Sequence, residues 1–196
     1  MKIVCIGDSL TYGYGVYKEK CWVDILRKGK NIRILNRGIN GDTSSGMLSR
    51  SYRDVVENKP DAVIIMGGSN DFLAGYGLGR VQENIIELIK EAEQFGIIPI
   101  IGVQTAIEEE LAMKKWSFDV DYSEINKKIL EYRSWIIDYC QEKNIVYIDF
   151  YKALAEKLEL MTEEEIYFDG LHPTEFGHNV MGKCAIEVFN NLFHQC

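Results

Sequence analysis

Residues 2–15 read KIVCIGDSLTYGYG, a short β-branched and apolar run followed by a polar, glycine-rich segment. The run has the length and composition of a strand buried on both faces, and it predicts a β-strand over residues 2–6. The GDSL sequence at residues 7–10 is typical of a turn from a strand into a helix. Such a tetrapeptide arises by chance at a given site only about once in several tens of thousands of positions. It is therefore a candidate functional motif.

Similar apolar runs recur along the chain, with helix-like segments between them. Further strands are predicted at residues 32–36, 62–66, 98–103 and 146–150. Apolar residues have helical spacing at residues 22–27, 45–57, 81–95 and 122–142, and a last helix is predicted from residue 174 to about residue 193. This alternation predicts an α/β fold whose five-stranded parallel sheet is covered by helices on both faces.

Length and charge limit the classes of protein to consider. The 196 residues are enough for one self-sufficient core, and no linker or repeat interrupts them, so we expect one domain over residues 1–196. The formal net charge is −8. Nucleic acids and anionic membranes attract cationic surfaces, so this charge argues against both as partners. A small-molecule partner remains the expectation.

The cysteines and the N-terminus indicate a reducing location. The five cysteines are scattered, odd in number and without a C-x-x-C pair, which favours reduced thiols over a zinc or redox site. The N-terminus has one basic residue and an apolar run too short for a signal peptide or a membrane span. We therefore expect a cytoplasmic protein with no membrane insertion.

Ser9 is the candidate nucleophile. A serine at a strand-to-helix turn can present its hydroxyl as a nucleophile and its backbone N–H as a donor to an oxyanion. Taken alone, the same serine is more typical of a plain helix N-cap in a glycine-rich turn.

Two further segments offer donors to an oxyanion. Gly41 precedes three good N-cap residues, so its N–H can point outward at the start of a helix. The amide of Asn70, in Gly68-Ser69-Asn70-Asp71, is a neutral donor that can stabilise a developing negative charge. Each segment taken alone is also explained by turn formation.

Asp169-Gly-Leu-His172-Pro supplies a candidate base. An aspartate three residues before a histidine can accept the Nδ1–H of the ring, which leaves Nε2 free to take a proton from a serine. Taken alone, a histidine such as His172 is more often a capping or packing residue. Because the four segments fall after predicted strands of one sheet, we expect them to share a crevice at the carboxyl ends of the strands.

These four segments resemble the conserved blocks of the SGNH hydrolases, also called GDSL esterases or lipases, in the right order over residues 7–173. The resemblance implies a flavodoxin-like three-layer α/β/α sandwich and hydrolysis of esters or thioesters through an acyl-serine, without a metal or another cofactor. It assigns Ser9 as nucleophile and oxyanion donor, and Gly41 and Asn70 as further donors. His172 would be the base and Asp169 its partner.

The resemblance leaves the substrate open among carboxylic esters, lysophospholipids, thioesters and acetylated carbohydrates. Apolar and aromatic residues near the motifs suit an acyl chain or a small aromatic ester. The residues that we expect to contact a substrate are Asp8, Phe72, Leu73, Tyr76 and Leu171. The irregular stretch at residues 104–121 is expected to be a partly helical excursion over the sheet's edge, and its Trp116 and Phe118 are candidates for a pocket wall.

A different class of function is a flavodoxin-like module that binds a phosphate or a nucleotide without hydrolysis. The loop after the first strand lacks lysine, and the chain lacks both G-x-x-x-x-G-K and the spacing of G-x-G-x-x-G. The hydrolase is therefore the favoured interpretation.

Overall fold

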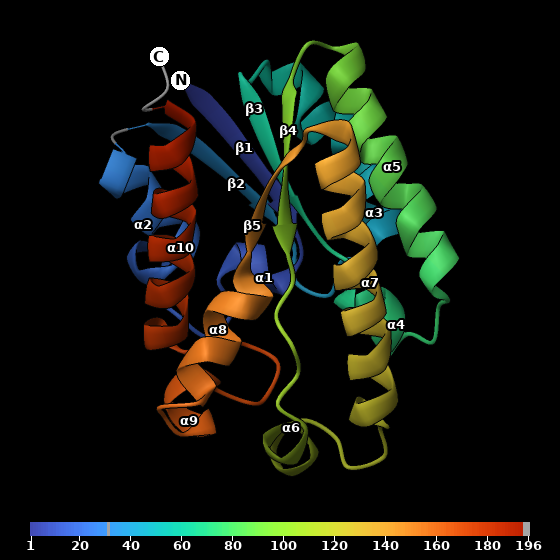
Figure 1. Cartoon of the computed structure of the whole chain (residues 1–196), viewed down its shortest axis with the longest axis vertical. Coiled ribbons are helices and arrows are strands. Elements are labelled where there is room, and N and C mark those ends of the chain that lie inside the picture. Colours follow the sequence, from blue (N-terminus) through green and yellow to red (C-terminus); the bar gives the residue numbers. More distant parts are fainter. Residues whose placement is uncertain (31, 194–196) are drawn as a thin grey trace.

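The five predicted strands form one parallel sheet in the order β2-β1-β3-β4-β5 (Figure 1). The computed structural model describes residues 1–30 and 32–193. The strands are β1 (Lys2–Gly7), β2 (Arg33–Gly38), β3 (Ala62–Met66), β4 (Ile98–Val103) and β5 (Val146–Asp149). The prediction of a five-stranded parallel sheet is confirmed. Strand β2 differs most, because it begins one residue later than predicted and ends two residues later.

Helices cover both faces of the sheet, so the predicted three-layer α/β/α sandwich is confirmed (Figure 1). One face carries α3 (Ser44–Asp54), α5 (Leu78–Gln94) and α7 (Tyr122–Lys143). The other carries α2 (Trp22–Lys30), α8 (Phe150–Leu158) and α10 (Glu175–Phe193). Shorter helices are α1 (Ser9–Tyr12), α4 (Ser69–Leu73), α6 (Glu109–Lys115), α9 (Glu163–Ile166) and the 3₁₀ turns η1 (Lys18–Lys20) and η2 (Val56–Asn58). Helices α4, α8 and α9 were not predicted.

The interior strand β1 explains why the strands are almost continuously apolar. Its side chains point alternately to the two faces, and both faces are packed. Val4 and Ile6 belong to the core beneath α3, α5 and α7. Ile3 and Cys5 belong to the core beneath α2, α8 and α10. An exposed face would have required polar residues at every second position.

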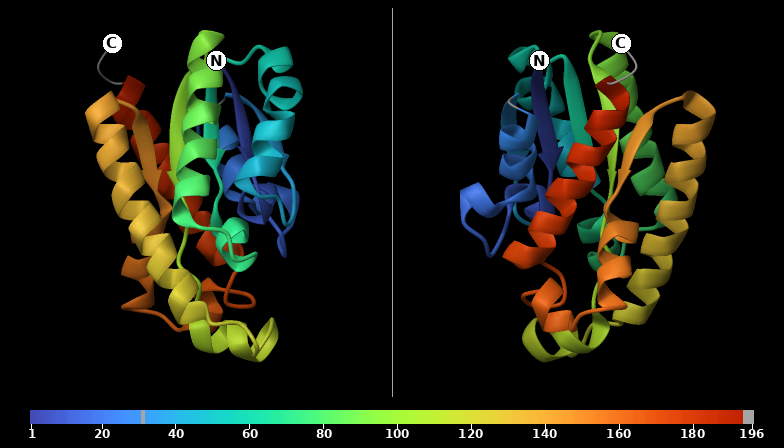
Figure 2. Two further views of the ribbon diagram at one scale, coloured as in Figure 1. Left: turned by 90° about the vertical axis from the view of Figure 1, so that its right-hand side faces the viewer. Right: turned by 60° about the vertical axis from the view of Figure 1, so that its left-hand side comes forward.

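The strand order places a crevice at the end of β1. The chain moves outward from β1 to β2 and then crosses back to β3 on the other side of β1. At such a reversal the loops after the strands diverge and leave an opening outside the carboxyl ends of the strands. Residues 104–121, with helix α6, lie across this end of the sheet (Figure 2). The prediction of a partly helical excursion is confirmed by α6, and because this segment follows the interior strand β4, it covers the carboxyl ends of the strands and not a lateral edge strand.

The described cysteines form no disulfide, and the described helices differ from a membrane span in length or hydropathy. Cys5, Cys21, Cys140 and Cys184 are free thiols, and Cys196 lies outside the described residues. Within the part of the chain that the structure describes, none of the helices combines the length and the hydropathy needed to cross a bilayer.

Two neighbouring residues of α7 test the packing of this core. Ile129 is 1% exposed and Leu130 is 47% exposed. We expect Ile129→Ala to lower the free energy of unfolding by about 2–5 kcal/mol, because it removes buried methyl groups and leaves a cavity. Leu130→Ala, the matched control, should change it by about 0.5 kcal/mol or less. Urea unfolding measures both, and equal effects would contradict the assigned packing.

Candidate active site

Ser9 lies at the junction of β1 and α1. Asp8 caps the helix by accepting a hydrogen bond from the backbone N–H of Leu10 at 2.9 Å. Gly7 is required because a Cβ there would lie 2.5 Å from the carbonyl oxygen of Met66 on the neighbouring strand. Ser9 is the first residue of the helix and is 8% exposed. The sequence Gly-Asp-Ser therefore builds a tight turn that holds the serine in place.

His172 brings a ring nitrogen to this serine from the other end of the chain. Its Nε2 lies 3.0 Å from Ser9 Oγ, and its Nδ1 lies 2.8 Å from Asp169 Oδ2. His172 and Asp169 are both buried. The three side chains thus form a continuous hydrogen-bonded row across 163 residues of sequence.

The turn at residues 169–172 is held by hydrogen bonds to the side chain of Asp169 and by a contact with the start of α6. Asp169 Oδ1 accepts hydrogen bonds from the backbone N–H groups of Leu171 (3.0 Å) and His172 (2.8 Å). Gly170 has φ of 89°, in the left-handed region, and its carbonyl accepts from the N–H of Glu108 at 2.7 Å. A Cβ on Gly170 would lie 2.4 Å from the backbone nitrogen of Ala112, so the fit requires glycine.

The hydrogen bonds of Asp169 determine its charge. Burial raises the pKa of this carboxyl, but hydrogen bonds from the ring and backbone of His172 and from the N–H of Leu171 outweigh burial and hold the pKa below its usual range. Asp169 is therefore a carboxylate at neutral pH. Because a carboxylate can only accept, the proton of the neutral imidazole lies on Nδ1, and Nε2 can accept the proton of Ser9.

Gly41 and Asn70 border the same cavity as Ser9 and His172. Gly41 has φ of 73° and is the third residue of a turn closed by a 3.2 Å hydrogen bond from the N–H of Asp42 to the carbonyl of Ile39. Asn70 Nδ2 donates to the carbonyl of Asp42 at 2.9 Å. The loop after β2 and the first turn of α4 are therefore directly joined beside the serine.

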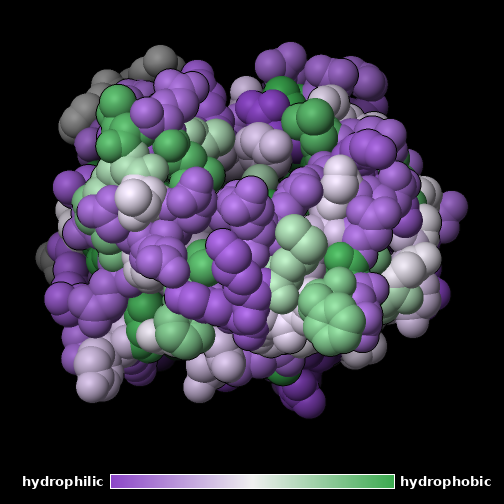
Figure 3. Space-filling view, turned by 90° about the horizontal axis from the view of Figure 1, so that it is seen from below, coloured by the Kyte–Doolittle hydropathy of each residue, from purple (hydrophilic) through white to green (hydrophobic). Residues whose placement is uncertain are grey.

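The cavity is small and mainly apolar. Its volume is about 110 Å³, and its apolar walls include Leu73, Ile107 and Leu171. The rings of Tyr14 and Trp116 lie 4.4 Å and 5.4 Å from the imidazole of His172, measured between ring centroids. Both aromatic residues are exposed, so they form part of the rim of the cavity. The surrounding face is mainly hydrophilic, with separate apolar patches (Figure 3).

The sequence pattern of the GDSL-like lipase/acylhydrolase family matches residues 5–180, which include every residue of this site. The chain belongs to this family. Two curated relatives and one solved structure illustrate the likeness.

The chain is 32% identical over 108 residues to esterase TesA of Pseudomonas aeruginosa, covering 52% of the chain and 54% of TesA. It is 25% identical over 156 residues to an acetylxylan esterase of Geobacillus stearothermophilus, and the match covers 79% of this chain and 71% of that esterase. A G-D-S-L family member from Veillonella parvula matches with a TM-score of 0.84 and 29% identity over 97% of this chain and 98% of that one. The chain spans about half the length of several curated relatives, TesA among them.

In this GDSL-family chain, some of the residues predicted to contact a substrate border the cavity and others do not. Asp8, Leu73 and Leu171 border the cavity. Phe72 does not: it is 2% exposed and packs against the ring of Tyr132 in the core. The reason is helical geometry, because Asn70 and Leu73 are three positions apart and share one face of α4, whereas Phe72 points to the other.

Two further aromatic residues of the predictions do not border the cavity, for a different reason. Tyr76 stacks on the guanidinium of Arg80, 4.1 Å from the ring centroid, and is not among the residues that border the cavity. Phe118 is 81% exposed and also lies outside the cavity wall, whereas Trp116 borders it. Position in a loop cannot show which of two nearby aromatic side chains turns inward.

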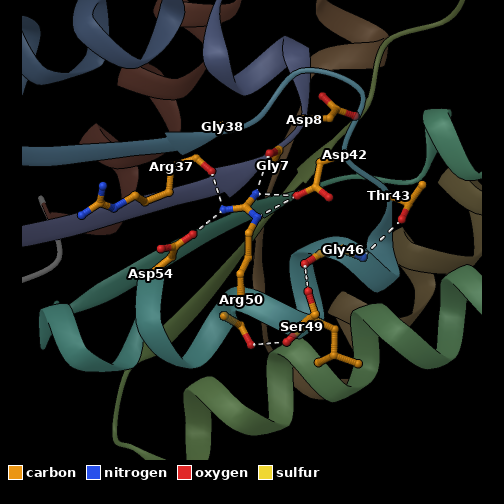
Figure 4. Close-up of polar contacts among 12 residues, drawn as sticks. Gly7, Asp8, Arg37, Gly38, Asp42, Thr43, Gly46, Ser49, Arg50 and Asp54 are labelled. Carbon is orange, nitrogen blue, oxygen red and sulfur yellow. Dashed lines mark hydrogen bonds and ion pairs between the residues drawn. The ribbon is translucent and has the colours of Figure 1, made fainter.

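Sequence reasoning missed two residues that organise the site. Asp71 accepts hydrogen bonds from the backbone N–H and the hydroxyl of Ser44, at 2.8 and 2.6 Å, which fastens the start of α3 beside Asn70. Arg50 of α3 binds the loop that carries Gly41 (Figure 4). Asp71 adjoins a motif residue and could have been suspected. Arg50 carries no local signal, because an arginine on a helix usually faces water.

Asp8 is the second titratable group with a displaced pKa beside Ser9. Burial raises the pKa of its carboxyl to about 7, against the opposing effects of the Leu10 N–H and His172. Gln104 Nε2 lies 3.1 Å from its Oδ2. Between about pH 4 and pH 7 the folded chain therefore holds a proton that the unfolded chain has released, so stability falls as the pH rises through this window.

Asp8→Asn should remove this pH dependence, since asparagine also caps helices and does not ionise. The difference between the folded and unfolded pKa of Asp8 corresponds to about 4 kcal/mol of unfolding free energy. Between about pH 4.5 and pH 7.5 we therefore expect the unfolding free energy of the wild type to fall by up to about 4 kcal/mol more than that of the variant. Urea unfolding at both pH values measures the loss. The exposed Asp119→Asn control should follow the wild type, and a variant as pH-dependent as the wild type would contradict the assignment.

Proposed function

We propose that the protein hydrolyses carboxylic esters of short acyl groups through an acyl intermediate on Ser9. The observation that carries this proposal is the row Ser9 Oγ, His172 Nε2, His172 Nδ1 and Asp169 Oδ2, with contacts of 3.0 and 2.8 Å. A serine hydroxyl is a weak nucleophile until a base accepts its proton, and this geometry provides that base together with its orienting carboxylate.

The reaction has two acyl-transfer steps. His172 Nε2 takes the proton of Ser9 as Oγ attacks the ester carbonyl, whose oxygen becomes an oxyanion. The C–O bond to the alcohol then breaks, and His172 gives its proton to the leaving oxygen. A water molecule, activated by the same nitrogen, attacks the acyl-serine and releases the acid. Asp169 stabilises the imidazolium in both steps.

The proposed oxyanion donors are the N–H groups of Ser9 and Gly41 and the side-chain amide of Asn70. An amide nitrogen carries two protons. One of those on Asn70 donates to the carbonyl of Asp42, which holds the plane of the amide. The second proton is then available to the oxyanion. Donors fixed before the reaction stabilise the transition state without reorganisation.

Cavity size supports short acyl groups. The volume of about 110 Å³ is smaller than an engineered apolar cavity of about 150 Å³ that accepts benzene. The apolar walls at Leu73, Ile107 and Leu171 suit a chain of a few carbons. The name of the Geobacillus relative, an acetylxylan esterase, is consistent with a small acyl group.

The alcohol part of the ester belongs on the side of His172. This follows because His172 must protonate the leaving oxygen. Tyr14 and Trp116 flank the imidazole there and are exposed. Their rings therefore offer an apolar surface to the alcohol.

Charge argues against the alternative of a phosphate- or nucleotide-binding module. Among the described residues that border the cavity there is no lysine or arginine, and the carboxyl of Asp8 is one of them. A phosphate carries up to two negative charges, and the described wall of the cavity has no cationic side chain of this kind to neutralise them.

Turnover of p-nitrophenyl esters from acetate to palmitate tests the proposal. We expect hydrolysis of acetate and butyrate esters, at least tenfold lower kcat/KM for octanoate and longer chains, and at least a 10³-fold loss of kcat in Ser9→Ala. A fluorophosphonate should label the wild type but not Ser9→Ala. The exposed Ser49→Ala is the matched control and should be labelled normally. A wild type that neither turns over esters nor reacts would contradict a serine hydrolase.

Asn70→Ala tests the side-chain donor separately. Loss of one oxyanion donor typically costs about 3 kcal/mol in the transition state, so kcat should fall roughly 100-fold or more with little change in KM or Tm. Asn179→Ala, an exposed change on α10, is the control. Near-normal kcat in Asn70→Ala would remove Asn70 from the mechanism.

A further inference from the structure

We propose that Arg50 is a positioning residue of the reaction, because it holds the turn that carries the Gly41 N–H in register with the Ser9 turn. The inference rests on the proposed function and deepens it. Arg50 touches neither the cavity nor the reacting atoms, so it acts through the residues that it binds.

The guanidinium of Arg50 joins four chain segments (Figure 4). Nε and Nη2 contact Asp42 Oδ2 at 2.8 and 2.7 Å, in the loop after β2. Nη1 donates to the carbonyl of Arg37 at 2.9 Å and to Asp54 Oδ2 at 2.8 Å. Nη2 donates to the carbonyl of Gly7 at 3.0 Å. One side chain of α3 therefore binds the carboxyl ends of both β1 and β2.

The carbonyl of Gly7 connects this network to the nucleophile. It accepts hydrogen bonds from Arg50 Nη2 and from the backbone N–H of Ile39, each at 3.0 Å. Gly7 stands two residues before Ser9, and Ile39 is the first residue of the turn that contains Gly41. The same acceptor thus ties the start of that turn to the end of the serine's strand.

The far end of the turn is held by Asp42. Its carboxylate is bound by Arg50, its N–H closes the turn on Ile39, and its carbonyl accepts from Asn70. With both ends held, the peptide N–H of Gly41 has little freedom to rotate. Steric crowding does not restrict this peptide, since no described atom lies within 4 Å of a Cβ built on Gly41.

Only arginine can make these contacts together. Arg50 is 8% exposed, and its planar fork directs several donors at fixed angles, whereas a lysine ammonium offers three donors from one point. Arg53 provides a matched comparison on the same helix. It also pairs with Asp54, at 3.0 Å, but its side chain is 69% exposed.

The test compares Arg50→Lys and Asp42→Asn with Arg53→Gln, using the short p-nitrophenyl ester that the wild type hydrolyses best. We expect kcat to fall at least tenfold in Arg50→Lys and at least threefold in Asp42→Asn, with KM changed less than threefold. A phenylboronic acid, whose serine adduct carries a negative tetrahedral centre, should bind Arg50→Lys at least tenfold more weakly. Arg53→Gln should remain within twofold of the wild type in all three measurements.

The pH–rate profile separates positioning from general damage. The acid limb of kcat/KM should keep its midpoint in Arg50→Lys, because Ser9, His172 and Asp169 keep their contacts. If Arg50→Lys does not fold, Asp42→Asn decides the matter by the same measurements. The inference is overturned if kcat and boronate binding stay within twofold in the folded variants, or if the acid limb moves with the loss of rate. A wild type without ester turnover overturns both proposals, whereas an active wild type that needs Ser9 upholds the proposed function whatever Arg50 does.

Discussion

The hydrogen bond between Ser9 and His172 is the contact on which the site depends. It joins residues 163 positions apart, and neither partner could hold it without a rigid support. Ser9 is held because it follows β1, an interior strand that is paired with β2 on one side and with β3 on the other. His172 is held because Asp169 binds its ring and Gly170 is pressed against the start of α6. The sheet and the segment at residues 104–121 together therefore place this pair precisely.

The strand reversal beside β1 explains why the other groups gather there. The segments after β1, β2 and β3 meet at one opening, and each brings one residue of the motifs to it: Ser9, Gly41 and Asn70. Two side chains outside this cavity wall join the loops. Asp71 binds the start of α3, and Arg50, on α3, binds the carboxyl ends of β1 and β2. The loops are therefore connected to one another as well as to the sheet.

Local patterns succeeded wherever a residue's environment is set by its neighbours in sequence. The apolar runs predicted all five strands, because strands with two packed faces must be apolar throughout. Phe72 shows where such reasoning ends. It stands two residues from Asn70 in a segment rich in glycine and polar residues, yet it points into the core because the helix α4 turns it away from the cavity. Helix α8 was missed since it follows β5 without an intervening loop, so strand and helix patterns run together.

The sequence by itself determined the fold class, the family and the residue types available for chemistry, since periodicity and short motifs are local properties. Only the tertiary structure decided which aromatic residues border the cavity, how small that cavity is, and that Arg50 of α3 binds the ends of β1 and β2 and the loop after β2 at once. These facts depend on distances between segments far apart along the chain. Such distances are set by how helices pack on the sheet, and no single segment carries that information.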